Sequence, residues 1–371
     1  METAHQALLA ETLAEPDGML TVDSCEFPKK GRESVGVARQ YCGAVGKVDT
    51  CQSGVFVGYA SRKGYGLLTS RLYLPESWCT PEQTARREAT LVPEALRFQT
   101  KPQIARDLLA RLVATQRFPA TWLGCDTVFG ADWAFLDAVP PGTHYFASVR
   151  ATTLVFRRRP QVHVPRYRGR GPKPRKPRVT RGRAVPVRTL AASTTCPWTP
   201  VVLAEGATGP IRAAVAALRV YPARDGLPRE AVWLFLRRTA DGQLKAAFSN
   251  APAETSLAEL CRTATLRWPI EQCFQDGKSQ VGMDHYEHRS WPAWHRHMLY
   301  VCLALHFLLR LRLRFKKTAG PDAPAGAPPR GGGGAGQGLD ADPCVGTRRI
   351  LHETEPHCLS LAPEETAGAP R

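Results

Sequence analysis

The spacing of apolar residues predicts an alternation of strands and helices over the first 150 residues. Short apolar runs bounded by turn residues predict strands at residues 18–24, 53–60, 65–74, 121–130 and 144–150. Apolar positions at helical spacing predict helices at residues 102–116 and 131–139. The expected order is β-β-β-α-β-α-β. Asp23 stands at the end of the first predicted strand, and Asp126 stands near the end of the fourth.

The pattern changes after residue 150. Residues 157–183 hold twelve Arg or Lys and nothing that could build a core, so we expect a flexible basic segment that binds nucleic acid electrostatically. Three further apolar runs predict a small β-rich insertion, at residues 212–221, 231–237 and 244–249. Two helices are expected next, at residues 256–281 and 291–315. Pro269 either kinks the first of these helices or begins a new helix there.

Composition narrows the class of protein. The chain has 371 residues and a formal net charge of +17, which favours a polyanionic partner such as nucleic acid, although positive charge can also serve solubility alone. The 11 cysteines include no Cys-x-x-Cys pair and follow no secretory signal, so neither a zinc ribbon nor a disulfide framework is expected. The longest apolar run, residues 298–309, is too short to span a bilayer. We expect a soluble, cytoplasmic protein with no membrane partner.

The stretch RWPIEQCFQDGK, residues 267–278, places Arg267, Glu271 and Lys278 near one side of a helix. Such a set is often only a surface ion pair. If Glu271 instead converges with Asp23 and Asp126, the three carboxylates repel one another until divalent cations neutralise them. Mg²⁺ or Mn²⁺ prefers such an oxygen shell, and two ions about 4 Å apart can support a phosphoryl displacement. Arg267 and Lys278 would then grip DNA phosphates.

The same stretch resembles the Arg-(3)-Glu-(6)-Lys signature of DDE transposases of the insertion-sequence 4 superfamily. Residues 22–78 and 267–298 are similar to its insertion-sequence 701 group, and the resemblance covers roughly residues 16–315. It implies an α/β, ribonuclease-H-like mixed sheet flanked by helices, with a β-rich insertion between the second Asp and the Glu. The implied activity is metal-dependent DNA cleavage at insertion-sequence ends, followed by strand transfer into target DNA.

The resemblance also assigns roles to residues. Asp23, Asp126 and Glu271 become the catalytic acids and the metal ligands, holding two Mg²⁺ or Mn²⁺ ions. The implied partner is DNA, at the element ends and at the target, in the bacterial cytoplasm at the nucleoid. No small-molecule substrate is expected. A homodimer in the DNA complex is possible. Basic residues expected to contact DNA are Arg267, Lys278, Lys29, Lys30, Arg289 and Arg296.

Some of these residues allow a second interpretation, and some positions depart from the family pattern. Lys29 and Lys30 fit a solvated turn equally well, and Arg289 and Arg296 fit helix caps. The superfamily's tyrosine three residues before Arg267 is an alanine here. Its common Asp-x-Thr-Gly-Phe reads Asp-Ser-Cys-Glu-Phe at residues 23–27, where the glutamate adds a carboxylate that is either close to the metals or exposed. The four histidines of residues 285–297 lack a Cys to complete a zinc set.

Family members place a helical DNA-binding domain before the first acid, and this chain shows none. We therefore expect an N-terminal remnant, a first core part, a basic linker with the insertion, C-terminal core helices and a disordered Gly/Ala/Pro-rich tail, at residues 1–17, 18–150, 151–255, 256–317 and 318–371. The alternative function is a truncated, inactive transposase remnant that retains only DNA binding. A third hypothesis is a repurposed DNA-binding protein without chemistry.

Overall fold

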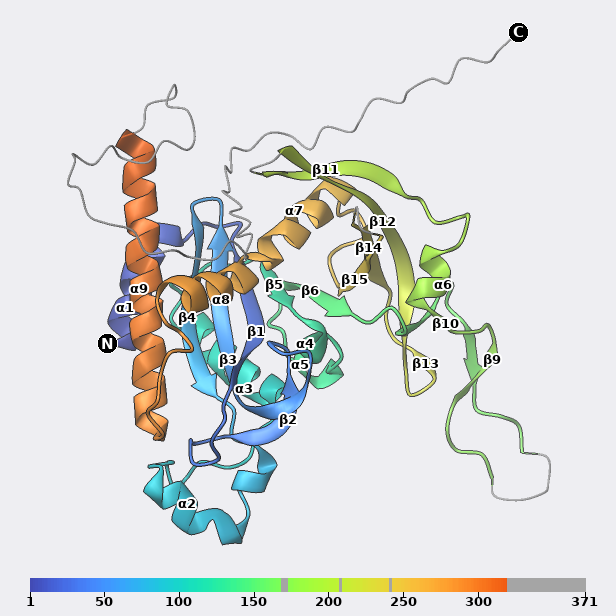
Figure 1. Ribbon diagram of the computed structural model, residues 1–371. Helices are drawn as coiled ribbons and strands as arrows, with labels where there is room; N and C mark the ends of the chain where they lie inside the picture. Colours follow the sequence, from blue (N-terminus) through green and yellow to red (C-terminus); the bar gives the residue numbers. More distant parts are fainter. Residues whose placement is uncertain (168–172, 207–208, 240–241, 319–371) are drawn as a thin grey trace.

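The central element of the fold is a mixed β-sheet, and two of the expected acids lie on or directly after its strands. The computed structural model describes residues 1–167, 173–206, 209–239 and 242–318 (Figure 1). The central strands are β1 (Met19–Pro28), β3 (Lys47–Ser61), β4 (Gly64–Leu72), β5 (Trp122–Cys125) and β6 (His144–Val149). They lie in the order β4–β3–β1–β5–β6. β1, β3 and β4 are antiparallel neighbours, whereas β5 runs parallel to β1 and β6 parallel to β5. The expected tail lies outside the described residues from residue 319 onward.

The strands that follow residue 150 continue this sheet beyond β6. These strands are β7 (Leu154–Phe156), β10 (Val185–Pro186), β11 (Thr199–Gly206), β12 (Gly209–Arg224), β13 (Leu227–Pro228), β14 (Val232–Arg238) and β15 (Leu244–Ser249). At the other end of the sheet, β2 (Ala38–Cys42) pairs with β3. β15 pairs with β6, β14 with β15, and β12 with β14, all antiparallel. The strands expected as an insertion are therefore part of the same sheet, joined to the central strands through the pairing of β15 with β6.

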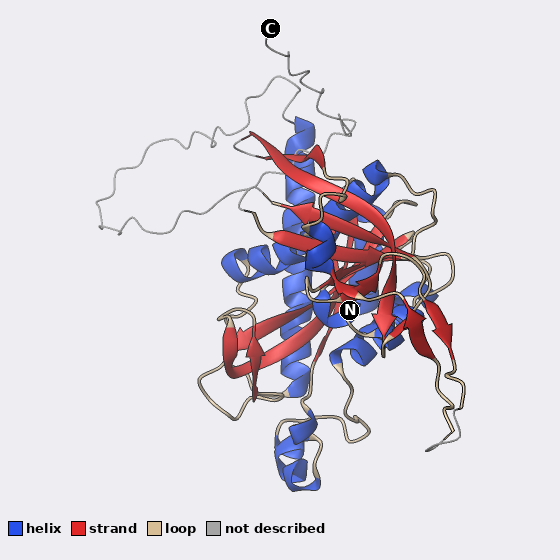
Figure 2. Ribbon diagram, turned by 90° about the vertical axis from the view of Figure 1, so that its right-hand side faces the viewer, coloured by secondary structure: helices blue, strands red, loops and turns tan. Residues whose placement is uncertain are grey.

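Helices cover both faces of the sheet (Figure 2). The helices are α1 (Glu2–Leu13), α2 (Thr84–Ala89), α3 (Lys101–Ala114), α4 (Thr127–Gly130), α5 (Trp133–Asp137), α6 (Val187–Ala191), α7 (Leu257–Arg267), α8 (Pro269–Gln280) and α9 (Trp291–Thr318), with 3₁₀ turns η1 (Glu76–Trp78) and η2 (Pro81–Gln83). Of the helices in the described ranges, none is long and apolar enough to cross a membrane.

Alternation along β1 decides which core each side chain joins. Leu20 and Val22 point into the core that α1 and α3 cover. Cys25 and Phe27 point to the opposite face, where they pack with residues of α8 and α9. Asp23 falls in this second register, and it is therefore directed to the side of the sheet that α7 and α8 cover.

Several expectations about local structure need correction. β1 continues to Pro28, so the prediction that Asp23 ends its strand is wrong; pairing with β3 carries the strand through polar Ser24 and Glu26. Pro269 begins α8 as its first residue, which decides between the two alternatives for that position. The basic segment, residues 157–183, contains a two-stranded ribbon of β8 (Gln161–His163) and β9 (Arg178–Arg181) rather than flexible chain alone.

Candidate active site

Asp23 lies within β1 in a buried position. Its exposed fraction is 8%, and its Oδ1 accepts a hydrogen bond of 2.7 Å from the backbone N–H of Ser24. In the antiparallel ladder it stands opposite Phe56 of β3. A carboxylate in the middle of a sheet is costly to desolvate unless other groups compensate its charge, so its surroundings matter for what it can do.

Asp126 follows β5 directly and caps the short helix α4. Its Oδ1 accepts hydrogen bonds from the backbone N–H groups of Val128 at 3.0 Å and Phe129 at 3.3 Å. β1 and β5 are parallel, and their last paired residues are Val22 and Cys125. Asp23 and Asp126 are each the next residue along these strands, so the parallel register brings the two acids side by side.

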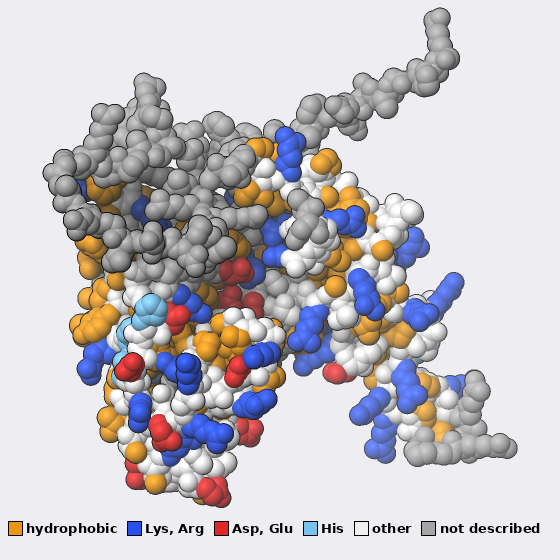
Figure 3. All heavy atoms as spheres, viewed as in Figure 1, with side chains coloured by type: hydrophobic (Ala, Val, Ile, Leu, Met, Phe, Trp, Pro, Cys, Tyr) orange, Lys and Arg blue, Asp and Glu red, His pale blue; other side chains and the backbone are white. Residues whose placement is uncertain are grey.

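Glu271 reaches the same region from the start of α8. Arg267, the last residue of α7, donates from Nη2 to Glu271 Oε1 across 2.7 Å. Its side chain crosses β5 at Gly124, where an added Cβ would lie 2.9 Å from Arg267 Cγ. Only a glycine leaves room for this approach. Figure 3 shows acidic side chains at the base of a hollow between the two halves of the molecule, with basic side chains around it.

Asp23 lies within the electric fields of both other acids. Burial raises the pKa of Asp23 well above its ordinary value, Asp126 and Glu271 raise it further, and Arg267 opposes the rise. Burial also raises the pKa of Asp126, against hydrogen bonds from the α4 backbone and the charge of Arg267. Both carboxyls thus lack the positive charge that would let them ionise at their usual pH.

This deficit fits a divalent cation. Three carboxylates supply the hard oxygen ligands that Mg²⁺ and Mn²⁺ prefer, and the buried Asp23 lacks a sufficient counter-charge. Within the described ranges, no three His, Cys, Asp or Glu side chains form a ready-made metal cluster. In this structure, Glu271 Oε1 accepts a hydrogen bond from Arg267, and Asp126 Oδ1 accepts hydrogen bonds from the α4 backbone.

The other expected basic residues divide into two groups. Lys278 donates to the carbonyl of Glu26 at 3.1 Å, and Lys29 donates to the carbonyl of Tyr286 at 3.0 Å and lies over its ring. These two ammonium groups are therefore engaged inside the fold. The side chains that are exposed are Lys30, Arg289 and Arg296.

Sequence reasoning missed Lys101, the first residue of α3. Its Nζ lies 3.0 Å from Glu26 Oε1 and 3.4 Å from Ser24 Oγ, and its charge also acts on Asp126. Although burial raises the pKa of Glu26, Lys101 and hydrogen bonds lower it overall. Glu26 is thus held ionised beside a lysine. The capping box that begins α3 at Thr100 marks the position of Lys101 in the sequence, but not its partner.

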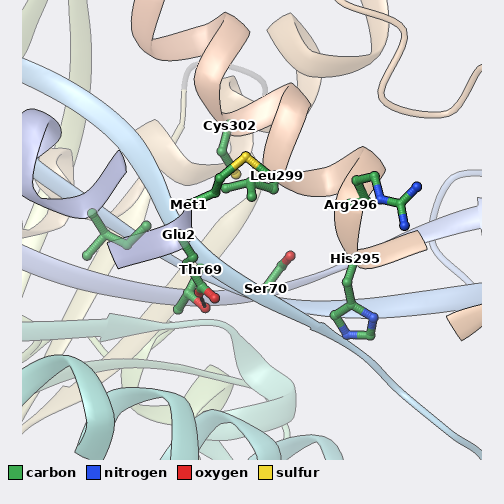
Figure 4. A pocket seen from close by; sticks show the side chains of 9 residues that line it. Met1, Glu2, Thr69, Ser70, His295, Arg296, Leu299 and Cys302 are labelled. Atoms are coloured by element: carbon green, nitrogen blue, oxygen red, sulfur yellow. Dashed lines mark hydrogen bonds between the residues drawn. The ribbon is translucent and has the colours of Figure 1, made fainter. Parts of the chain in front are cut away.

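The histidines near α9 make contacts within the fold. His295 Nε2 accepts from the backbone N–H of Leu72 at 3.3 Å, and its Nδ1 lies 2.9 Å from the carbonyl of Trp291. His288 stacks on Tyr286. His295 also lines a cavity of about 260 Å³ between α1, β4 and α9, which none of the three acids reaches (Figure 4).

Comparison with known proteins adds a family. A family profile described as "DDE superfamily endonuclease" matches residues 2–210, a segment that includes Asp23 and Asp126 and ends before Glu271. No curated protein matches the chain. A solved structure of the NurA nuclease from Sulfolobus solfataricus aligns over 87% of this chain and 93% of its own, with 8% identity and a TM-score of 0.28. A TM-score this low does not establish a shared fold.

Proposed function

Because the chain belongs to the DDE superfamily of endonucleases, we propose that it is a DNA transposase that cleaves strands at insertion-sequence ends and joins them to target DNA. The single observation that carries the proposal concerns the buried carboxyl of Asp23. Asp126 and Glu271, from two distant segments of the chain, act on it electrostatically, and Arg267 compensates its charge only in part. The Arg-(3)-Glu-(6)-Lys spacing of residues 267–278 supports the assignment to the insertion-sequence 4 superfamily and its 701-like group.

The strand order supports a ribonuclease-H-like core. Three antiparallel strands in the order β4–β3–β1, followed by parallel β5 and β6, are the arrangement expected of that fold. The first acid lies on the central strand and the second follows the adjacent parallel strand. The strands β7 and β10 to β15 all lie between Asp126 and Glu271 in the chain, where the proposed insertion belongs.

In this proposal each polar group has a defined part. Asp23, Asp126 and Glu271 would hold two Mg²⁺ or Mn²⁺ ions, which when bound activate water and stabilise the leaving oxygen. Arg267 neutralises part of the acid cluster and, once Glu271 turns away from it, has its guanidinium free for a DNA phosphate. Lys278 and Lys101 hold the chain around Glu26, beside the first acid.

One observation favours a second candidate, a remnant that binds DNA without cutting it. Glu271 is engaged by Arg267 at 2.7 Å, and a protein in which this ion pair persists would lack its third ligand. Both candidates predict DNA binding, and only the first predicts cleavage.

A magnesium-dependent nicking assay separates the two. The wild-type protein should cut DNA, and Glu271→Gln should cut at least roughly 100-fold more slowly, because loss of a ligand costs no less than loss of a residue that supports one. Glu254→Gln, an exposed glutamate in the loop before α7, is the matched control. Equal cutting by wild type and Glu271→Gln would refute the site, and no cutting by the wild type would favour the remnant.

A further inference from the structure

Arg237 is a basic residue of the strands after residue 150 that interacts electrostatically with Arg267 and Glu271. It lies on β14, where alternation places it on the same face as Phe235. Phe235 belongs to a core cluster with Trp122 of β5 and Leu260 of α7. This is the face that α7 covers, and Arg237 continues the row past that core, toward the end of α7.

The neighbouring strands agree with this placement. Arg237 stands opposite Val215 on β12 and opposite Lys245 on β15. Val215 is buried in the same cluster as Phe235. Cross-strand partners project from the same face of a sheet, so Arg237 and Lys245 form a short basic row at the end of this core.

Two charged groups of the candidate active site act on Arg237. Arg267 and Glu271 both interact electrostatically with its guanidinium, which is itself partly buried. Burial and Arg267 both lower the pKa of Arg237, and Glu271 opposes them. Glu271 already has a close partner in Arg267. A second arginine therefore adds positive charge that is not in an ion pair with any carboxylate of the described residues.

Arg267 also has unused donor capacity. Its Nη2 binds Glu271, but its Nη1 is buried and has no hydrogen-bond partner in the part of the chain that the structure describes. A buried N–H group without an acceptor is costly in a folded protein, and its position points to an acceptor that arrives from outside. Two guanidinium groups within each other's electric field suit an anion with several oxygens, such as a phosphodiester.

We infer that Arg237 and Arg267 together form a binding site for one backbone phosphate of DNA, next to Glu271. The inference rests on the proposed function for its choice of DNA as the ligand. It gives the strands after residue 150 a direct part in the site: β14 supplies one half of the phosphate clamp, and the end of α7 supplies the other. Arg237 is the residue that sequence spacing could not identify, because it lies 30 positions before Arg267 in the chain.

The salt dependence of DNA binding tests this site without any catalysis. Binding of a short duplex is measured in EDTA over a range of salt concentrations for wild type, Arg237→Gln and Arg237→Lys. Each neutralised phosphate contributes about 0.9 to the slope of log K against log salt. Arg237→Gln should reduce the slope by about that amount and weaken binding several-fold, whereas Arg237→Lys should keep the slope.

Arg212→Gln provides the matched control, since Arg212 is exposed on neighbouring β12 and carries the same charge. The inference is overturned if Arg237→Gln leaves the slope unchanged, or if Arg212→Gln reduces it equally. A purely structural role would lower the melting temperature of Arg237→Gln and leave the slope intact, which also overturns it. If the proteins bind DNA with the expected slopes but the wild type does not cut it, only the proposed cleavage activity is refuted. If the wild type does not bind DNA, both the proposed function and the phosphate site are refuted.

Discussion

Arg267 donates to Glu271 across 2.7 Å although the two residues belong to different helices. α7 ends at Arg267 and α8 begins at Pro269, but the intervening Trp268 keeps helical dihedrals of φ −67 and ψ −30. The i, i+4 geometry therefore survives the break. This pair holds the third acid in place, and its guanidinium is a positive charge that acts on both other acids.

Arg267→Gln should weaken both the ionisation of the acids and cleavage. Without the guanidinium, Asp23 and Asp126 lose a charge that opposes the rise of their pKa values, so both acids should ionise less readily. We expect cleavage to fall roughly 100-fold and the magnesium concentration for half-maximal activity to rise. Arg262→Gln, on the same helix and paired with Asp17 at 3.5 Å, is the control. Unchanged magnesium dependence in Arg267→Gln would contradict this role.

Gly124→Ala should disturb the site by steric means alone. Its Cβ would lie 2.4 Å from Met19 Cε and 2.9 Å from Arg267 Cγ, so both side chains must move. We expect a loss of about 1–3 kcal/mol in unfolding free energy, measured by urea denaturation, and reduced cleavage. Gly31→Ala, where an added Cβ meets nothing within 4 Å, should change neither quantity. Wild-type stability and activity in Gly124→Ala would show that the position of the Arg267 side chain does not depend on the absence of a side chain at residue 124.

Buried histidines should make the fold sensitive to acid. Burial lowers the pKa of His5 to about 4, with a further contribution from His306, and burial lowers the pKa of His295 to about 4. Below pH 6.5 the unfolded chain takes up protons that the folded protein refuses, so stability should fall from pH 6.5 to about 4 and level off below. Each histidine can contribute up to roughly 3 kcal/mol.

His5→Leu isolates this effect from that of the carboxyls. Urea unfolding at pH 7 and pH 4.5 should show a smaller loss of stability in the variant than in the wild type. Asp23 has a raised pKa, which acts in the opposite direction, but it is common to both proteins. An identical loss in the two proteins would show that His5 accepts its proton in the folded state.

The basic ribbon should bind DNA independently of the acids. β8 and β9 project from the body of the molecule (Figure 1), and side chains around β9 are exposed and basic: Lys173, Arg175, Lys176 and Arg178. Changing all four to Gln should reduce the slope of log K against log salt by up to about 3.6, at 0.9 per contact. Melting temperature should stay unchanged, because the ribbon adds no core. A slope equal to that of the wild type would exclude the ribbon as a DNA contact.

Much of the site follows from the sequence because it depends on local signals. The strand expected over residues 121–130 is too long, because β5 ends at Cys125 and residues 127–130 form α4. Asp126 nevertheless lies at the end of that strand, where it caps α4. Pro269 similarly marks a helix start. The spacing of Arg267 and Glu271 gives their contact, because four residues make about one helical turn.

The parts that sequence reasoning missed depend on pairing between distant segments. β1 extends past Asp23 because β3 supplies partners as far as Pro28, which no local pattern reveals. Lys101 meets Glu26 only after α3 packs against the sheet. Arg237 approaches Glu271 because β15 pairs with β6 and carries β14 beside the core. Each of these relationships is set by strand register or helix packing rather than by neighbours in the chain.

Binding of Mn²⁺ in the presence of a short DNA duplex, followed by electron paramagnetic resonance, tests the shared metal site most directly. We expect wild-type protein to bind the ion, and Asp23→Asn, Asp126→Asn and Glu271→Gln each to lose most of that binding. Glu254→Gln should bind as wild type does. If all three variants bound Mn²⁺ as tightly as the wild type, the three acids would not share a metal site.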